Sequence, residues 1–286
     1  MTSDPDVIRI WDNSAPYWEK HRDIIRGMFH PITEALIEDA QIGPGQAVLD
    51  VATGPGEPAL SIAEFVGLSG TVAGIDPIPG MIAAARRVAD ARHFHNARFE
   101  VASADQVPFP DRHFDAVVCR FGVMFFPSPH DGVREMLRVL KPDRKIAFAV
   151  WNFGDKNPFH SHLANIVDRY VSPEPLPPDA PDAFRFAERG KLLKILHEAG
   201  AAQTSERLLP FNIEIPLSLD AYWALRWDMS DKLRTRLSSV PPEQLASIRQ
   251  EVSRDVVAYS TDGVIRFPAQ VLIVSGYGAH QRTVAS

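Results

Sequence analysis

The stretch 46–60 constrains the fold of this chain more than any other. An apolar segment, 47–52, carries one acid, Asp50, and leads through a glycine-rich turn into residues typical of a helix start, the pattern of a buried strand that feeds a helix. Gly54 and Gly56 lack a Cβ, so the backbone can adopt positive φ and a ligand can lie directly against it. The free N–H groups at the helix start favour electron-rich ligand atoms. This junction is therefore predicted to bind a ligand.

A second acid follows one structural unit later. The β-rich run 71–75 ends in Asp76, which lies 26 positions after Asp50. An acid at the carboxyl end of a strand faces the crevice where doubly wound folds bind ligands, and its carboxylate can accept both hydroxyls of a ribose. The alternative is that Asp76 only caps the next helix, which the intervening Pro77 disfavours. We expect Asp76 to bind a ribose.

Strands and helices continue to alternate through the first half of the chain. After helices over 59–66 and 81–91, the pattern predicts strands over 98–101, 114–119 and 146–151 and an amphipathic helix over 131–140. Strands separated by helices at this spacing indicate a parallel sheet with helices on both faces.

The N-terminal segment 7–29 is rich in aromatic residues. It predicts a helix, and two interpretations remain open: the aromatic face covers the core, or Tyr17 and Trp18 close over a bound ligand. Pro31 is predicted to start a new helix that ends before the glycines near residue 43.

The second half of the chain differs in character. Residues 152–183 form a long proline-rich connection with one helical run, and such insertions at the ligand end of a sheet are often lids. His160 and His162 have poor metal spacing and are predicted to be surface histidines. Strands are expected over 205–215 and 264–277, with a helix over 190–199. Between the two strands, 217–262 carries aromatic residues at partly helical spacing, which form either core or the wall of a substrate pocket.

Composition excludes several classes of function. The chain has 30 basic and 36 acidic residues, a formal net charge of −6, which argues against holding nucleic acid or anionic membranes by bulk charge. The first ten residues do not resemble a secretory signal, and no apolar run approaches the ~18 residues of a membrane span. We expect a cytoplasmic protein without a membrane span. The single cysteine, Cys119, excludes an internal disulfide and a cysteine-cluster metal site, and no metal site is predicted.

Four motifs in order resemble class I S-adenosylmethionine-dependent methyltransferases. They are Val-Leu-Asp-Val-Ala-Thr-Gly-Pro-Gly-Glu-Pro-Ala-Leu (48–60), Gly-Ile-Asp-Pro-Ile-Pro-Gly-Met-Ile (74–82), Val-Pro-Phe-Pro-Asp-Arg-His-Phe-Asp (107–115) and Arg-Glu-Met-Leu-Arg-Val-Leu-Lys-Pro (134–142). The chain is most similar to the branch typified by the ubiquinone and menaquinone biosynthesis C-methyltransferases. The resemblance covers about residues 7–152.

The resemblance implies an α/β fold with a Rossmann-like, doubly wound, seven-stranded and mostly parallel sheet. Its strand order would be 3-2-1-4-5-7-6, with an antiparallel last strand and helical lid insertions. A single domain, 1–286, would have its cofactor-binding core at about 30–153 plus 184–215 and 263–286. The lid and substrate elements would be 1–29, 154–183 and 216–262.

The resemblance also implies the residues that bind S-adenosylmethionine. Asp50 would hold the amino group of the methionine moiety, and Asp76 the ribose hydroxyls. The other implied cofactor-binding residues are Ala52, Thr53, Gly54 and Gly56 in the loop, Pro77 and Ile78 beside the adenine, Ser103, Ala104 and Asp105 along its polar edge, and Arg120 and Tyr17.

Two positions depart from the family pattern. The family usually has glycine at Ala52, a change that the loop should tolerate if φ there is negative. Ser103 replaces the usual aspartate that reads the adenine amino group, so the Ser103 hydroxyl or Asp105 would accept that hydrogen bond.

The predicted activity is methyl transfer from S-adenosylmethionine, with S-adenosylhomocysteine as product, to the carbon, oxygen or nitrogen of a small-molecule acceptor. No catalytic residue is nominated, and a homodimer is left open. One alternative is an NAD(P)-dependent oxidoreductase, because Gly54-Pro-Gly56-Glu-Pro-Ala59 matches the dinucleotide fingerprint and Asp76 lies 20 residues after Gly56. Against it, Asp50 would repel a pyrophosphate but suits an ammonium group. The other alternative is a non-catalytic module that binds adenosylmethionine.

Overall fold

A single mixed sheet forms the centre of the molecule. The computed structural model describes residues 5–173, 175, 177 and 179–278. The strand order is β3-β2-β1-β4-β5-β8-β6, with β7 paired to β8. The strands are β1 (Ala47–Val51), β2 (Thr71–Asp76), β3 (Ala97–Val101), β4 (Phe114–Arg120), β5 (Leu140–Trp151), β6 (Ala202–Ile215), β7 (Ser260–Thr261) and β8 (Val264–Tyr277).

The predicted topology is confirmed. Strands β1 to β5 pair in parallel, and β8 is antiparallel to both β5 and β6. The strand predicted as the seventh is β8, because the two-residue β7 precedes it. All the carboxyl ends of β1, β2, β4 and β5 therefore meet at one edge, where ligands bind in such folds.

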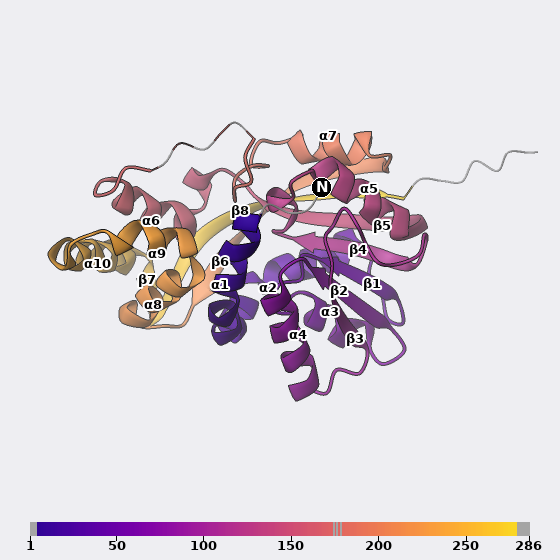
Figure 1. Cartoon of the computed structure of the whole chain (residues 1–286), viewed down its shortest axis with the longest axis horizontal. Coiled ribbons are helices and arrows are strands. Elements are labelled where there is room, and N and C mark those ends of the chain that lie inside the picture. Colours follow the sequence, from indigo (N-terminus) through magenta and orange to yellow (C-terminus); the bar gives the residue numbers. More distant parts are fainter. Residues whose placement is uncertain (1–4, 174, 176, 178, 279–286) are drawn as a thin grey trace, which may run out of the picture.

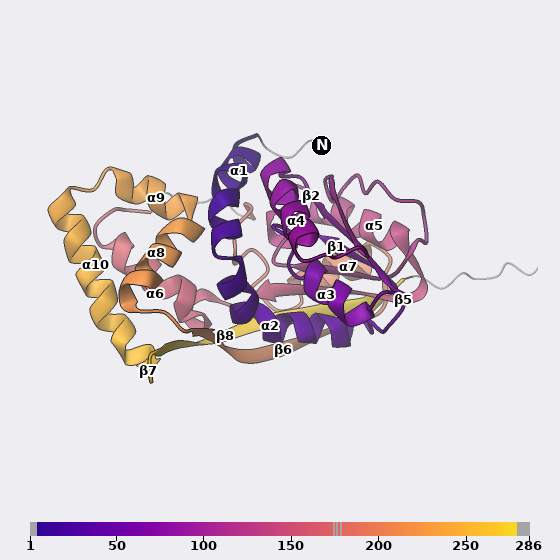
Figure 2. The ribbon, with the colours of Figure 1, turned by 90° about the horizontal axis from the view of Figure 1, so that it is seen from below.

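Helices cover both faces of the sheet. Figures 1 and 2 show α2, α3 and α4 on one face and α5 and α7 on the other. The helices are α1 (Pro5–Lys20), α2 (Arg22–Asp39), α3 (Ala59–Val66), α4 (Pro79–Ala91), α5 (Pro129–Val139), α6 (Pro158–Asp168), α7 (Lys191–Glu198), α8 (Leu219–Met229), α9 (Asp231–Ser238) and α10 (Pro242–Val256). No helix within these described residues is both long enough and apolar enough to cross a bilayer.

The prediction that Pro31 starts a helix is wrong. Pro31 lies inside α2, which begins at Arg22. An interior proline costs a helix about 3 kcal/mol because it lacks the N–H and crowds the preceding turn. Here Met28 and Ile32, both fully buried, lie on either side of it in one apolar stripe against the sheet. Burial of that stripe outweighs the local cost.

Helices α6, α8, α9 and α10 form a layer beyond one end of the sheet. Strands β6 and β8 pair along their length, but only residues 271–277 of β8 also pair with β5. The remainder is a two-stranded ribbon that leads to α8, α9 and α10, which gather with α6 (Figures 1 and 2). Helix α1 contacts α4 on one side and α8 and α9 on the other.

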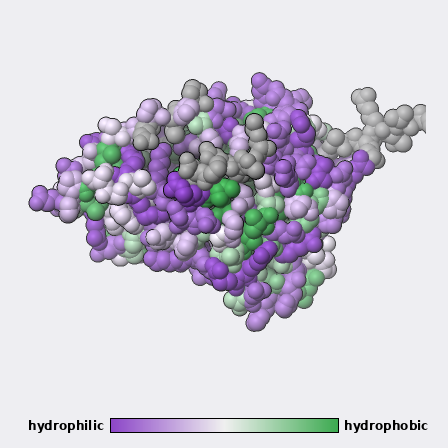
Figure 3. All heavy atoms as spheres, viewed as in Figure 1, coloured by the Kyte–Doolittle hydropathy of each residue, from purple (hydrophilic) through white to green (hydrophobic). Residues whose placement is uncertain are grey.

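The aromatic stripe of 217–262 is mostly core. Tyr222 and Leu225 are buried, as are Leu233 and Leu237, and they belong to the same apolar cluster as the sheet. The face of the molecule seen in Figure 3 is largely hydrophilic, with its apolar residues in separate groups. The apolar residues of the insertion therefore point mainly inward, and a few of them reach the cavity described next.

Candidate active site

A cavity of about 730 Å³ lies at the carboxyl ends of the parallel strands. Its walls come from the strand ends, from α1 and α2, and from the helical layer. The residues that line it include Val7, Ile8, Trp11, Trp18, Arg22, Ile25, Phe29, Ala52, Thr53, Gly54, Glu57, Asp76, Pro77, Ile78, Met81, Ser103, Ala104, Asp105, Arg120, Phe121, Phe125, Phe126, Trp151, His160, Arg226 and Met229. Most of the predicted cofactor-binding residues are thus brought together.

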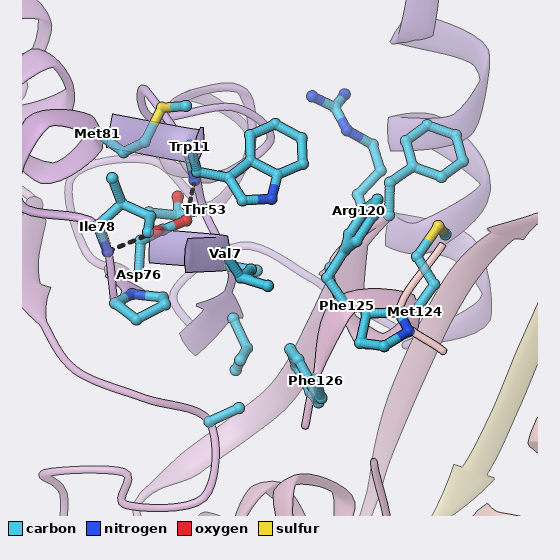
Figure 4. Close-up of a pocket in the computed structure, with 18 of the residues that line it drawn as sticks. Val7, Trp11, Thr53, Asp76, Ile78, Met81, Arg120, Met124, Phe125 and Phe126 are labelled. Carbon is cyan, nitrogen blue, oxygen red and sulfur yellow. Dashed lines mark hydrogen bonds between the residues drawn. The ribbon is translucent and has the colours of Figure 1, made fainter. Parts of the chain in front are cut away.

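Asp76 joins the two loops at one end of this cavity. Its Oδ2 accepts a hydrogen bond from the Gly54 N–H and its Oδ1 from the Ile78 N–H, both at 3.0 Å (Figure 4). The carboxylate is only 6% exposed, and burial raises its pKa to about 6 while the two backbone N–H groups oppose the rise. Helix α4 begins at Pro79 with Ile78 as its N-cap, so the alternative role of Asp76 as helix cap is not realised. Its remaining lone pairs can accept hydroxyls.

Apolar side chains surround the space beside Asp76. Ile78 and Met81 come from the start of α4, and Trp11 of α1 lies across from them (Figure 4). The Trp11 ring meets the Phe125 ring edge-on at 5.3 Å. Flat apolar walls of this kind suit a purine ring.

The polar edge of the same space is formed by 103–105. The Ser103 hydroxyl donates to Asp105 Oδ1 at 2.5 Å, and both residues line the cavity with Ala104. The hydroxyl and carboxylate are therefore close enough to act together on one amino group, in place of the family's usual aspartate.

Asp50 lies beneath the glycine turn and does not line the cavity in this conformation. It is fully buried, and its Oδ2 accepts a hydrogen bond from the Ala59 N–H, at the start of α3, at 3.1 Å. Burial raises its pKa to about 7, although the nearby Thr53 hydroxyl and the Arg120 charge act in the opposite direction. Its Oδ1 has no hydrogen-bond partner of suitable geometry among the described residues.

Arg120 connects the end of β4 to two other elements. Its Nη1 donates to Thr33 Oγ1 at 2.8 Å, and its Nη2 donates to the Glu57 carbonyl at 3.0 Å. Glu57 is 8% exposed, and its Oε1 lies 3.6 Å from Arg26 Nε. These charges lie at the glycine turn, where one could pair with the carboxylate of an amino acid and the other with its ammonium group. Sequence reasoning missed Thr33 and Glu57 because nothing in their spacing reveals a contact with Arg120.

Two residues at this edge adopt left-handed backbone conformations. Ala52 has φ +59° and Phe121 has φ +63°. The condition under which the loop should tolerate alanine at 52, a negative φ, is therefore not met. Left-handed conformations cost L-residues about 1–2 kcal/mol, and such strain is typically found at functional sites.

Besides Asp50, two predicted residues lie outside the cavity lining, Tyr17 and Gly56. The Tyr17 ring packs under the Arg234 guanidinium, whose carbon is 4.5 Å from the ring centre. Gly56 has φ +102°, a conformation that L side chains rarely adopt, so the backbone of the turn requires glycine there. Of the two residues expected to close over a ligand, Trp18 does line the cavity and Tyr17 does not; Trp11, seven positions before Trp18 on the same face of α1, also lines it. That spacing was the signal available in the sequence.

Aromatic rings form the other end of the cavity. The Phe121 and Trp151 rings stack at 4.2 Å, and Phe29 meets both edge-on at 5.4 and 5.8 Å. His160 packs edge-on against Trp151 at 4.5 Å.

The prediction that His160 and His162 are surface histidines is wrong. His160 lines the cavity, and burial, with a smaller effect of the Arg226 charge, lowers its pKa to about 3. His162 is half-buried, with Nε2 3.6 Å from Asp255. Within the part of the chain that the structure describes, no three histidine, cysteine or acidic residues are grouped to hold a metal ion.

The site fits S-adenosylmethionine. It places a nearly buried carboxylate with spare lone pairs beside an apolar slot, and it places Arg120 and the Glu57 carboxylate at the glycine turn, where Glu57 Oε1 faces Arg26 but accepts no hydrogen bond. A nucleoside that carries an amino acid needs groups of these kinds in this order.

Comparisons with known proteins agree with this geometry. Residues 48–143 match a family described as a methyltransferase domain. The ubiquinone/menaquinone biosynthesis C-methyltransferase UbiE of Ectopseudomonas oleovorans is 33% identical over 138 residues, which are 48% of this chain and 81% of that protein. The protein of the same name from Ectopseudomonas mendocina is 32% identical over 166 residues, 57% of this chain. The match covers 63% of that relative's length, less than two thirds.

A solved structure supports the fold. The YcgJ protein from Bacillus subtilis has a TM-score of 0.56 at 21% identity, over 88% of this chain and 99% of that one. The strand order, the carboxylate at the end of β2 and the sequence matches lead to one family. The chain belongs to the class I S-adenosylmethionine-dependent methyltransferases, in the branch that resembles the ubiquinone/menaquinone biosynthesis C-methyltransferases.

Proposed function

We propose that this protein transfers a methyl group from S-adenosylmethionine to a small organic acceptor. The observation that carries the proposal is one continuous cavity with two chemically different ends. Asp76 and the glycine turn form the polar end, and the stacked rings of Phe121 and Trp151 form the apolar end. A methyl donor and its acceptor can therefore meet inside one enclosed space.

The polar end would hold the methyl donor. Asp76 would accept the ribose hydroxyls, Ile78 and Met81 would flank the adenine, and Ser103 with Asp105 would accept a hydrogen bond from its amino group. Arg120 would pair with the carboxylate of the methionine moiety. Glu57, or Asp50 after a local rearrangement, would pair with the ammonium group.

When bound, S-adenosylmethionine supplies an electrophilic methyl group on a sulfonium. The chain contributes mainly by aligning the acceptor and by excluding water. No base is assigned, because the low pKa of His160 makes it a weak proton acceptor at neutral pH. Residues 1–29, 154–183 and 216–262 are proposed to act as cover and acceptor wall, since Trp11, His160 and Arg226 from these segments line the cavity.

An NAD(P)-dependent reaction is disfavoured by the turn itself. The Gly54 N–H donates to the Asp76 carboxylate at 3.0 Å, so it is engaged where a pyrophosphate would need a free donor. The buried Asp50 lies directly below, and two carboxylates repel a phosphate.

Calorimetry tests this assignment. We expect the protein to bind S-adenosylmethionine and S-adenosylhomocysteine and not to bind NADH. Tight binding of NADH without adenosylmethionine binding would overturn the proposal. Turnover of the labelled methyl donor with panels of phenols, quinols, carboxylic acids and amines then separates an enzyme from a non-catalytic binding module.

A further inference from the structure

One guanidinium in the acceptor end of the cavity lacks a protein partner. Arg226, on α8, is 8% exposed and lines the cavity. Its Nε has no hydrogen-bond partner, and no ion pair or hydrogen bond joins it to any residue that the structure describes. The Phe159 ring lies beneath it, with its centre 4.0 Å from the guanidinium carbon, and the Tyr222 hydroxyl, one turn earlier on α8, is close enough to interact with its charge.

Another buried arginine and a half-buried one have hydrogen-bond partners in the protein. Arg120 donates to Thr33 and to the Glu57 carbonyl, and Arg234 donates to two carbonyls and to Asp231. A charge removed from water without a counter-ion costs several kcal/mol, so Arg226 is costly to keep unless a bound anion offsets that cost.

The surroundings of Arg226 define that anion. His160, across the cavity wall on α6, has a buried Nε2 without a partner, and it lies close enough for the Arg226 charge to lower its pKa. From His160 the wall continues as aromatic rings, since His160 meets Trp151 edge-on at 4.5 Å and Trp151 stacks on Phe121, which contacts Phe29. Arg120 also lies beside these rings, with its guanidinium carbon 5.6 Å from the centre of Phe29, but it already donates to Thr33 and to the Glu57 carbonyl. One cation without such a partner matches one negative charge on a flat apolar body, because a dianion would leave net charge buried.

We propose that the methyl acceptor is an aromatic monocarboxylic acid with a second nucleophilic group, a phenol oxygen or a ring atom, and that its carboxylate is bound by the Arg226 guanidinium while its ring packs against the cluster of Phe29, Phe121 and Trp151. The bond from the sulfonium to the methyl group would break as the bond from that second group to the methyl group forms, S-adenosylhomocysteine would leave, and the proton of the accepting group would pass to water. This proposal rests on the proposed methyl transfer and specifies its acceptor class. Planar guanidinium groups bind carboxylates through two parallel hydrogen bonds, so Arg226 would also fix the orientation of the ring relative to the polar end.

The test compares matched acids and amides. Benzoate, 3,4-dihydroxybenzoate and indole-3-acetate, each with its amide, are titrated calorimetrically into the protein saturated with S-adenosylhomocysteine. At least one acid should bind the unaltered protein and bind Arg226→Met about 10- to 100-fold more weakly, while its amide binds both proteins alike. Arg226→Lys should restore part of the affinity.

Controls separate this role from a structural one. Arg254→Met removes an arginine that is 71% exposed on α10 and should leave acid binding unchanged. Arg226→Met should keep or raise the unfolding midpoint of the ligand-free protein, because it removes a buried unpaired charge.

Several results would overturn the proposal. They are binding of none of the acids by the unaltered protein, equal binding by Arg226→Met, or preference for phenyl phosphate over the acids. If Arg226→Met instead loses S-adenosylhomocysteine binding, Arg226 belongs to the methyl-donor end. Failure of the unaltered protein to bind S-adenosylhomocysteine contradicts the proposed function, whatever the acids do.

Discussion

The methyl group of Ala52 occupies the space beside Gly122 at the ends of two neighbouring strands. An ideal Cβ on Gly122 would lie 2.3 Å from the Ala52 Cβ and 2.9 Å from the Cys119 Sγ. Gly122 itself has φ −91° and ψ −45°, which any residue can adopt. Space, and not backbone conformation, therefore requires glycine at 122 as long as alanine stands at 52.

This contact predicts coupling between two substitutions. Gly122→Ala should destabilise the protein by about 1–3 kcal/mol through overpacking. In an Ala52→Gly background the same change should cost less, although the Cys119 contact remains. Urea unfolding of the four proteins gives the coupling energy. Strictly additive effects would show that the loop shifts to relieve the contact.

Ala52→Gly alone should stabilise the protein. The left-handed backbone at φ +59° costs alanine about 1–2 kcal/mol, and the greater freedom of glycine in the unfolded chain returns part of that gain. We expect a net rise of about 0.5–1 kcal/mol in the free energy of unfolding. Ala116→Gly, the same change in the regular buried strand β4, should lower it. A loss of stability at position 52 would contradict the assigned conformation.

Asp76→Ala should weaken S-adenosylhomocysteine binding by about 1.5–3 kcal/mol, the scale of a hydrogen bond to a charged group. Calorimetry measures the change. The matched control is Asp115→Ala, because Asp115 also accepts a backbone hydrogen bond, from Ala47 at 3.0 Å, but at the opposite end of β1. If both variants lose affinity equally, the effect comes from the fold and not from the ribose contact.

The raised pKa of Asp50 predicts that its contribution to the free energy of unfolding falls as pH rises. Its pKa is about 7 in the folded protein and near 3.9 when unfolded, so the folded state binds the extra proton. The resulting stability is complete below about pH 4 and is lost as pH rises through about 7. The Asp50→Asn side chain cannot titrate. Between pH 5 and 8 the free energy of unfolding of this variant should therefore fall less than that of the unaltered protein, by an amount on the order of 1–3 kcal/mol. Urea midpoints across this range measure it, and parallel profiles would refute the assignment.

Trp11 and Tyr17 test which face of α1 covers the methyl donor. Trp11→Ala removes a ring that lines the cavity beside Met81 and should weaken S-adenosylhomocysteine binding by about 1 kcal/mol. Tyr17→Ala removes a ring that packs under Arg234 and should affect unfolding more than binding. If Tyr17→Ala weakened S-adenosylhomocysteine binding more than Trp11→Ala did, Tyr17 would belong to the site after all.

The sequence predicts the strand order and most of the polar end of the cavity because both depend on local patterns and recognisable motifs. Asp76 lies two residues before Ile78, from whose N–H it accepts a hydrogen bond, and the glycine turn is one continuous segment, so both can be recognised from neighbouring residues. The sign of φ at Ala52 and the continuation of α2 through Pro31 depend on tertiary packing, which no local pattern encodes.

Long-range contacts were equally hidden. Arg120 meets Thr33 across 87 positions, and Arg226 reaches the cavity from an insertion whose helical spacing looks like ordinary core. The residues around His160 in the sequence are typical of a surface helix, yet the position of α6 places His160 in the cavity wall. Such positions follow only from knowing which elements touch.

The ribbon formed by the outer parts of β6 and β8 has a consequence for engineering. Residues 216–263 leave the ribbon and return to it at adjacent points, since Ile215 pairs with Ile265. A segment from another family member, spliced at these two points, would change Arg226 and Met229 in the cavity wall while leaving Asp76, the glycine turn and Arg120 in place. Chimeras of this kind would change which acceptor the protein binds, and an unchanged affinity for the methyl donor would show that the rest of the site is intact.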